Sequence, residues 1–247
     1  MMIYPTIELQ RARCVTLNKG RLDDPMIWHV DPVETARGFA EAGAEWMHVT
    51  NFDAIESRDD SDEIVEQIIR AAGIPVQIGG GFRARDTVAR WIDLGAGRVV
   101  IGTLASRDPE LVKELAKYYP DQIVLAVDVW QGQVMTDGWR SVSAFDPADF
   151  IAAFSGAPLA GIIVTDVTGD VEDTDAQIGM ISGLAQDARA PVIANGVVRS
   201  LDDLSRLKYA PGIAGAIVGR ALFRKTVHLA EALELAQPAP EPVAEFR

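Results

Sequence analysis

Short apolar runs rich in β-branched residues alternate along the chain with longer segments whose apolar positions have a helical spacing. Runs of the first kind predict buried strands, and the amphipathic segments predict helices that cover them. Eight strands are expected, over 2–8, 45–50, 75–78, 98–101, 122–127, 161–165, 191–194 and 214–218. Seven helices are expected, over 31–41, 86–94, 109–117, 147–154, 176–188, 201–207 and 227–235.

Strands that alternate with helices form parallel sheets, and a closed barrel of eight such units needs about 250 residues. The chain has 247 residues. We therefore predict an α/β fold, a (β/α)8 TIM barrel, as a single domain over residues 1–236, with an open doubly wound sheet as the alternative. Residues 237–247 are rich in proline and acidic residues, and we expect them to be a flexible C-terminal tail.

A repeat at half the chain length favours the barrel over the open sheet. The segment PVQIGGGFRARD at 75–86 corresponds to PVIANGVVRSLD at 191–202, so that Gly80 aligns with Gly196. Further on, VVIGTLA corresponds to AIVGRALF. A near-constant offset across several strands predicts two duplicated half-barrels related by a pseudo-two-fold axis.

Glycine-containing turns follow four of the predicted strands. In TIM barrels the site lies at the carboxyl ends of the strands, where glycine lets the backbone approach a ligand and a following helix attracts anions. Each glycine alone is equally well explained as a turn residue. Four at matched positions predict two phosphate sites and one elongated substrate with a phosphate at each end. The turns are Gly79–Gly81, Gly102-Thr103, Asn195-Gly196 and Gly219-Arg220.

Two carboxylates face each other across the repeat. Glu8 ends the first predicted strand and Asp128 ends the fifth, on opposite sides of an eight-stranded barrel. A carboxylic acid and a carboxylate on two faces of a substrate can shuttle protons, provided that their environments set their pKa values apart. The alternative is that either one caps a helix or pairs with a base. Asp166 and Asp170 near the sixth strand are suited to bind ligand hydroxyls or to cap the next helix.

Net charge and cysteine content narrow the partners and the compartment. The formal net charge is −13, which disfavours nucleic acid, whereas backbone N–H groups can still hold a small phosphorylated ligand. Cys14 is the only cysteine, so no internal disulfide is possible and a cytoplasmic location is expected. The sequence carries neither a visible secretory signal nor an apolar run long enough to cross a membrane.

The sequence offers no metal or cofactor motif. His29, His48 and His228 lack ligand spacing, and His48 is expected to be a buried core residue. The turn at Gly79–Gly81 lacks the spacing of a dinucleotide-binding loop. Proton-transfer chemistry without a cofactor or metal is the remaining expectation, on a small bisphosphorylated metabolite bound by a protein that we expect to be a monomer.

Several motifs together resemble the phosphoribosylformimino-aminoimidazole carboxamide ribotide (ProFAR) isomerase family of histidine biosynthesis, with this chain as a divergent member. The motifs are YPTIEL, DPVETARGFAEAGAEWMHV, PVQIGGGFR, RVVIGT, DGW, VTDV and GAIVGRALF, and they span nearly the whole chain. The resemblance implies a half-barrel duplication, a substrate with two phosphates, and a cofactor-independent Amadori rearrangement of an aminoaldose to an aminoketose.

The resemblance also implies roles for individual residues. Asp128 would protonate the ring oxygen and Glu8 would remove the proton from the sugar carbon. Thr165 and Asp170 would support the substrate, and Trp139 would help to cover its heterocycle. The implied phosphate-binding residues are Gly81, Gly102 and Thr103 at one site and Gly196, Gly219 and Arg220 at the other. The repeated turns add Gly80, Arg83 and Asn195 as candidate substrate-binding or phosphate-binding residues.

The chain departs from the family pattern at positions expected on the ligand face. Glu8 replaces the usual Asp and is longer by one methylene, a shift of ~1 Å that can cost about 100-fold in rate. The other departures are Thr16, Asn51, Trp130, Gly169, Val171-Glu172 and Val197, the last of which replaces a phosphate-facing glycine. The alternatives are therefore a diverged paralogue acting on another phosphosugar, such as the anthranilate sugar of tryptophan biosynthesis, and a phosphate-binding or regulatory barrel with little catalysis.

Overall fold

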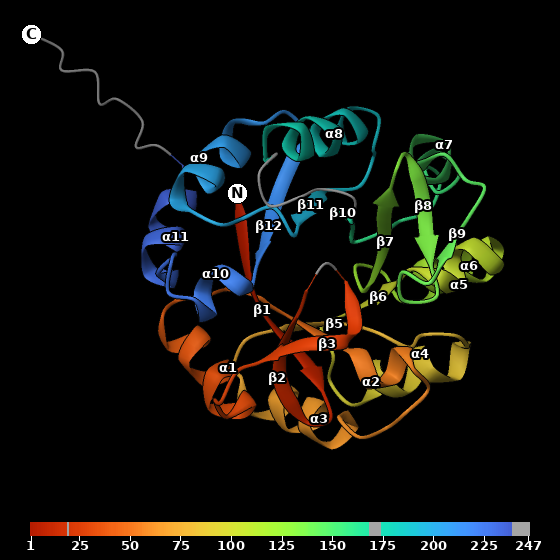
Figure 1. Ribbon diagram of the computed structural model, residues 1–247. Coiled ribbons are helices and arrows are strands. Elements are labelled where there is room, and N and C mark those ends of the chain that lie inside the picture. Colours follow the sequence, from red (N-terminus) through yellow and green to blue (C-terminus); the bar gives the residue numbers. More distant parts are fainter. Residues whose placement is uncertain (19, 168–173, 239–247) are drawn as a thin grey trace, which may run out of the picture.

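The computed structural model describes residues 1–18, 20–167 and 174–238. Within these residues, eight parallel strands pair in the cyclic order β1, β4, β5, β6, β7, β10, β11, β12 (Figure 1). The ring closes because β7 pairs with β10 and β12 pairs with β1. A closed barrel is thus confirmed over an open sheet, and all eight predicted strands are present. They are β1 Met2–Gln10, β4 Met47–Asn51, β5 Val76–Gly79, β6 Arg98–Ile101, β7 Ile123–Trp130, β10 Gly161–Asp166, β11 Val192–Asn195 and β12 Ile213–Val218.

Helices surround the barrel in the order of the chain (Figure 1). The seven predicted helices are present, with ends shifted by a few residues: α1 Pro32–Glu41, α4 Arg85–Asp93, α6 Pro109–Tyr118, α7 Pro147–Ala152, α8 Thr174–Gln186, α9 Leu201–Tyr209 and α11 Leu229–Ala236. Sequence reasoning missed α3 (Asp62–Ala71), although its apolar residues Ile64, Val65, Ile68 and Ile69 recur at helical spacing and pack on the core. Three short helices, α2 Phe52–Ile55, α5 Thr103–Arg107 and α10 Arg220–Phe223, follow β4, β6 and β12.

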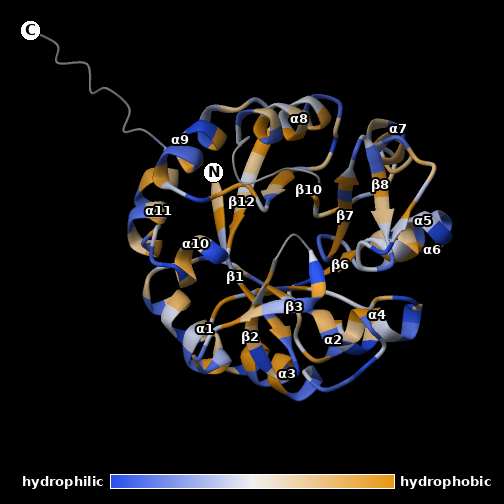
Figure 2. Ribbon diagram, viewed as in Figure 1, coloured by the Kyte–Doolittle hydropathy of each residue, from blue (hydrophilic) through white to orange (hydrophobic). Residues whose placement is uncertain are grey.

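The strand side chains alternate between two cores. Outward-facing residues such as Ile7 and Val49 are buried under the helices, and Figure 2 shows apolar barrel strands with polar residues along the surrounding helices. Inward-facing residues such as Tyr4, Val124 and Ile163 form a separate cluster inside the barrel. Because packed side chains fill the barrel interior, ligands can reach only its ends.

Two β-hairpins that the sequence did not reveal stand at the carboxyl end of the barrel. Strands β2 (Arg13–Asn18) and β3 (Arg21–Ile27) follow β1, and β8 (Gln133–Thr136) and β9 (Ser141–Val142) follow β7. Each therefore follows the first strand of a half-barrel. Strands β3 and β9 are largely exposed, whereas Cys14, Val15 and Leu17 of β2 are buried in a short run that sequence reasoning overlooked.

The backbone confirms the half-barrel duplication. Gly102 precedes α5 with φ −110° and ψ −83°, and Gly219 precedes α10 with φ −122° and ψ −86°. These dihedral angles lie outside the helical and extended regions and agree between the halves. The predicted tail falls mostly on residues 239–247, which lie outside the described residues. In the described part of the chain, no helix has both the length and the apolar character that crossing a membrane requires.

Candidate active site

Two adjoining cavities open at the carboxyl ends of the barrel strands. The first cavity has a volume of about 130 Å³ and is lined by Gly80, Gly102 and Asp128 among others. The second cavity has a volume of about 290 Å³ and is lined by Glu8 and Gly219 among others. Trp139, Thr165 and Asn195 line both cavities, so the two form one continuous bipartite site.

The structure brings together all the predicted site residues that it describes. In the first cavity lie Gly80, Gly81, Arg83, Gly102, Thr103 and Asp128. In the second lie Glu8, Gly196, Gly219 and Arg220, and the shared wall contains Trp139, Thr165 and Asn195. Asp170 and the departures at 169 and 171–172 lie outside the described residues.

Glu8 is the half-buried residue near the end of the otherwise buried strand β1. Its side chain points inward because it alternates with Ile7 and Leu9, which pack in the outer core. Burial raises the pKa of Glu8 to about 7, and the Arg220 guanidinium and the Leu17 backbone amide hold back part of that rise. A carboxylate with this pKa can accept and release a proton near neutral pH.

Asp128 lies at the end of β7, which is separated from β1 by three strands in either direction around the barrel. Its neighbour in the register is Thr165 on β10, and Thr165 in turn pairs with Asn195 on β11. The Asn195 amide donates to the Thr165 hydroxyl over 3.1 Å. Burial raises the pKa of Asp128, while Thr165 and Trp139, which can both donate toward its carboxylate, oppose the rise.

Trp139 occupies the boundary between the cavities. It sits on a turn in which Asp137, Gly138 and Trp139 all have positive φ, of 57°, 64° and 63°. Its ring packs edge-on against Phe52 at a centroid distance of 6.0 Å. The Asp137 backbone N–H donates to the Thr103 hydroxyl over 2.9 Å, and this bond ties the turn to the first cavity. A large aromatic side chain is therefore held over the middle of the site.

The glycines of the first cavity are required by their surroundings. Gly80 has φ +112°, and a Cβ there would lie 2.2 Å from the Asn51 carbonyl oxygen. Gly81 has φ +76°, and its Cβ would lie 2.6 Å from Ala54. These positions exclude side chains and leave the backbone open toward the cavity, as an anion site needs. The Arg83 guanidinium donates to the carbonyl of Ala54 over 3.0 Å and to that of Ile55 over 2.5 Å.

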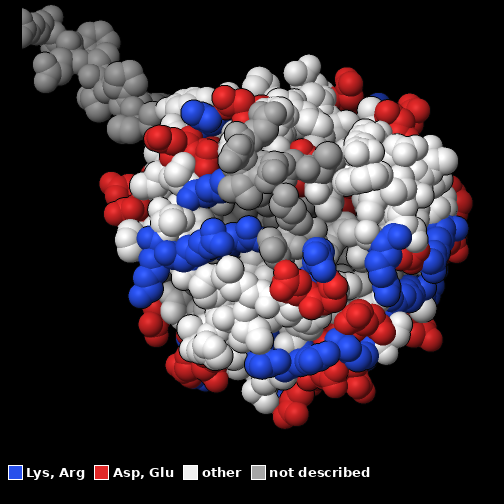
Figure 3. All heavy atoms as spheres, in the orientation of Figure 1, with Lys and Arg blue, Asp and Glu red and all other residues white. Residues whose placement is uncertain are grey.

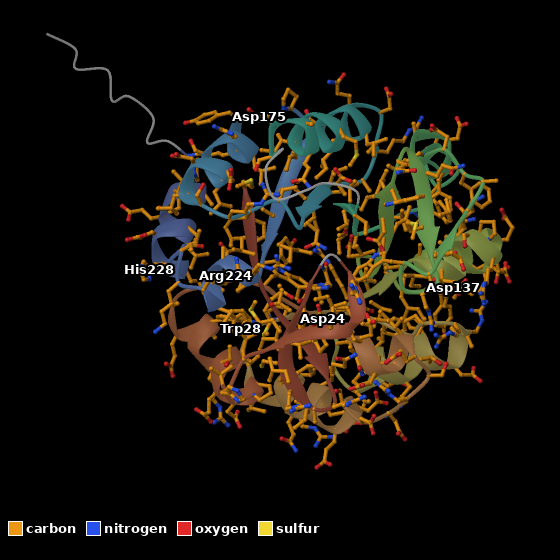
Figure 4. The ribbon with its side chains drawn as sticks, viewed as in Figure 1. Asp24, Trp28, Asp137, Asp175, Arg224 and His228 are labelled. Atoms are coloured by element: carbon orange, nitrogen blue, oxygen red, sulfur yellow. The ribbon has the colours of Figure 1, made fainter. Side chains whose placement is uncertain are left out.

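The second cavity contains three arginines, of which the sequence prediction included only Arg220. Burial lowers the pKa of Arg220, and the positive charges of Arg224 and Arg199 lower it further. Arg220 donates to the Leu17 carbonyl over 2.6 Å and is held against the β2–β3 hairpin. Figure 4 shows Arg224 at α10, and Figure 3 shows basic side chains gathered in that part of the surface. The repeat offered a signal for Arg199, which corresponds to Arg83.

Two of the expected ligand-face departures are not on the ligand face. Val197 is fully buried in the outer core and lacks the positive φ of its counterpart Gly81. Asn51 is 1% exposed, caps α2 by accepting from the Ala54 N–H over 3.1 Å, and donates to Asp62. The expectation for Val197 and Asn51 was wrong because the path of the backbone at the end of each strand turns these side chains away from the ligand. Thr16 does line the second cavity, as expected.

The protein is a TIM barrel with two opposed carboxyl groups, and a cavity lined by glycines lies beside each of them. This fold and site define a barrel protein that binds a small molecule, and the two cavities suit a ligand with an anionic group at each end. A family model described as histidine biosynthesis protein matches residues 2–228. The chain belongs to this family.

Curated relatives cover the whole chain. It is 66% identical over 246 residues to 1-(5-phosphoribosyl)-5-((5-phosphoribosylamino)methylideneamino)imidazole-4-carboxamide isomerase 1 of Ruegeria sp. (strain TM1040), with 100% of both chains covered. It is 64% identical over 247 residues to the isomerase 2 of the same name from Ruegeria pomeroyi, also over 100% of both chains. The isomerase of this name from Caulobacter vibrioides is 40% identical, over 94% of this chain and 98% of its own.

Proposed function

We propose that this protein catalyses the isomerisation for which its relatives are named, an Amadori rearrangement of an aminoaldose to an aminoketose on a substrate with two phosphates. The observation that carries the proposal is the opposition of Glu8 and Asp128 across the mouth of the barrel. A substrate that places one phosphate in each cavity would pass between the two carboxyl groups. Such placement supplies the orientation on which proton transfer depends.

In this proposal Asp128 acts as the acid. It gives its proton to the ring oxygen of the ribose, the bond from that oxygen to C1 breaks, and the amino nitrogen forms a double bond to C1. Burial raises the pKa of Asp128, which favours the protonated form that an acid requires. Thr165, supported by Asn195, would keep the carboxyl group aimed at the ring.

Glu8 acts as the base in the second step. It removes the proton from C2, and the electron pair of that bond moves to form the enaminol as the C1–N double bond returns to a single bond. The C2 hydroxyl then loses its proton and C1 gains one, which leaves the ketone. The steps balance without an oxidant or reductant. Arg220 favours the ionised form of Glu8 that a base requires.

The direct test is an assay of purified protein with ProFAR. We expect turnover that falls by about 100-fold or more in Asp128→Asn and in Glu8→Gln, the range in which general acid–base catalysis contributes. Asp187→Asn and Glu45→Gln, at exposed positions outside both cavities, are matched controls and should retain wild-type rates.

A histidine auxotroph that lacks the isomerase gives the corresponding test in cells. Growth restored by the wild-type gene and not by the Asp128→Asn gene is expected. Folded protein that neither turns over ProFAR nor restores growth would overturn the proposal. Turnover of the anthranilate sugar instead would show a diverged isomerase, and ligand binding without turnover would show a binding barrel.

A further inference from the structure

One row of polar residues inside the barrel is not used by the proposed reaction. His48 on β4 and Gln77 on β5 are neighbours in the parallel register, and Thr50 lies two residues after His48 on the same face of its strand. His48 is 6% exposed and Gln77 is fully buried. Polar side chains at such depth are usually hydrogen-bonded. Among the described residues the Gln77 amide oxygen has no hydrogen-bond partner, so the bonds of this row start at the Gln77 amide nitrogen.

The hydrogen bonds of this row run in one direction, toward the mouth of the barrel. The Gln77 amide nitrogen lies 3.2 Å from His48 Nδ1, and His48 Nε2 lies 2.9 Å from the Thr50 hydroxyl oxygen. An amide nitrogen can only donate, so Nδ1 must accept. A neutral imidazole then carries its proton on Nε2 and donates it to Thr50.

The ring stays neutral over the working range of pH. Burial lowers the pKa of His48 to about 4. A charged ring would have to donate from both nitrogens, which the Gln77 amide nitrogen at Nδ1 does not permit.

Thr50 converts this pattern into a feature of the ligand site. Because its oxygen accepts from His48, its own hydrogen must point elsewhere. Thr50 is half-buried and lines the first cavity together with Asp128 and the turn at Gly80-Gly81. A hydroxyl held in this way presents a donor to the cavity, and its natural partner is a ligand oxygen.

We propose that Thr50 is a further substrate-binding residue, whose hydroxyl is fixed by a Gln77–His48 relay as a donor to an oxygen of the phosphoribosyl group in the first cavity. The proposal rests on the proposed function for the identity of the ligand and deepens it. Gln77 and His48 are positioning residues, since they act through Thr50. Gln77 does not line the first cavity, and His48 reaches it with a ring whose two nitrogens are bonded to Gln77 and Thr50.

Kinetics of two Thr50 variants test the contact. Thr50→Val keeps the shape of the side chain and removes the donor, so KM should rise about tenfold with kcat nearly unchanged, as for a lost hydrogen bond to a charged group. Thr50→Ser should stay within about twofold of wild type. Thr35→Val on α1, whose hydroxyl bonds to its own helix, is the matched control. Equal KM values for wild type and Thr50→Val would overturn the proposal.

Two further measurements do not require turnover. Nitrogen chemical shifts of His48 in the unliganded protein should show a neutral ring with its proton on Nε2, and a proton on Nδ1 would overturn the relay. Titration with ribose 5-phosphate, followed at the Gly102 and Thr103 amides, should show weaker binding in Thr50→Val. Titration with inorganic phosphate shows which oxygen accepts from Thr50. If the acceptor is a phosphate oxygen, Thr50→Val should bind both ligands more weakly, whereas if it is a ribose oxygen, only the binding of ribose 5-phosphate should weaken.

A double-mutant cycle tests whether His48 acts through Thr50. His48→Leu should raise KM by a similar factor, and the double variant His48→Leu/Thr50→Val should be no worse than either single variant. Additive effects would overturn the relay. If wild-type protein fails to turn over ProFAR, the proposed function fails, whereas the His48 shifts and the ribose 5-phosphate titration still decide this proposal.

Discussion

The positive charge of Arg220, the first residue of α10, lowers the pKa of Glu8 near the end of β1. Burial acts in the opposite direction and is the larger effect, so the pKa of Glu8 is about 7. The same guanidinium donates to the Leu17 carbonyl of the β2–β3 hairpin. One arginine thus links the hairpin, the α10 helix and a proposed catalytic group. Its removal should affect proton transfer as well as phosphate binding.

The pH dependence of the reaction follows from this pair. A base must be ionised, so kcat/KM should rise with pH through about 7 as Glu8 loses its proton. Arg220→Gln removes the charge that lowers the pKa of Glu8, so the rising limb should move to higher pH, and Arg220→Lys should restore it. A pH–rate profile of each variant measures the effect. If the rising limb of the profile stays at the same pH in Arg220→Gln, the group whose ionisation produces it is not Glu8.

The raised pKa of Glu8 also predicts a pH-dependent cost in stability. In the folded protein the pKa is above its ordinary value, so the neutral form is favoured, and stability is lost as pH rises from about 4.5 through about 7. Glu8→Gln cannot ionise and avoids this loss. At pH 8 its melting temperature should exceed that of wild type by roughly 6–12 °C. A pKa raised from 4.5 to about 7 corresponds to about 3 kcal/mol, and each kcal/mol shifts the melting temperature by about 2–4 °C in a domain of this size. The difference should shrink toward pH 4.5.

Val197 gives a prediction opposite to the one that motif comparison suggests. Restoring the family glycine with Val197→Gly removes a fully buried side chain from the outer core. We expect a loss of about 2–4 kcal/mol in the free energy of unfolding, in the range of large-to-small core substitutions, without a lower KM. Denaturant unfolding and steady-state kinetics measure the two effects. Tighter substrate binding in Val197→Gly would contradict this prediction and show that position 197 belongs to a phosphate site.

Arg224 should contribute to affinity through charge. Arg224→Ala removes one of three arginines at the second cavity, and we expect KM to rise by about fivefold, more at low ionic strength than at high. Because Arg224 is not among the groups that shift the pKa of Glu8 or Asp128, kcat should change little. Arg70→Ala, on the outer surface of α3, serves as the control. An effect of Arg224→Ala that does not vary with salt would contradict a role through charge.

The sequence by itself determined the barrel, its duplication and most of the site. Apolar runs and the repeated glycine turns indicated eight strands and their carboxyl ends, and the repeat placed Glu8 and Asp128 at the ends of opposed strands. These features are local or periodic, so a linear pattern records them. The resemblance to a known family added chemical roles for individual residues, which the hydrophobic pattern cannot indicate.

Only the tertiary structure decided which side chains meet. The hairpins that follow β1 and β7 bring Leu17 to Arg220 and Trp139 to the boundary of the cavities, and no local pattern records either contact. Val197 and Gly81 align in the repeat, but one side chain turns into the outer core while the other position excludes a side chain. The bonds among Gln77, His48 and Thr50 join neighbouring strands that are far apart in sequence. Such contacts depend on strand register and chain direction after each strand, which the closed barrel sets and the linear pattern does not.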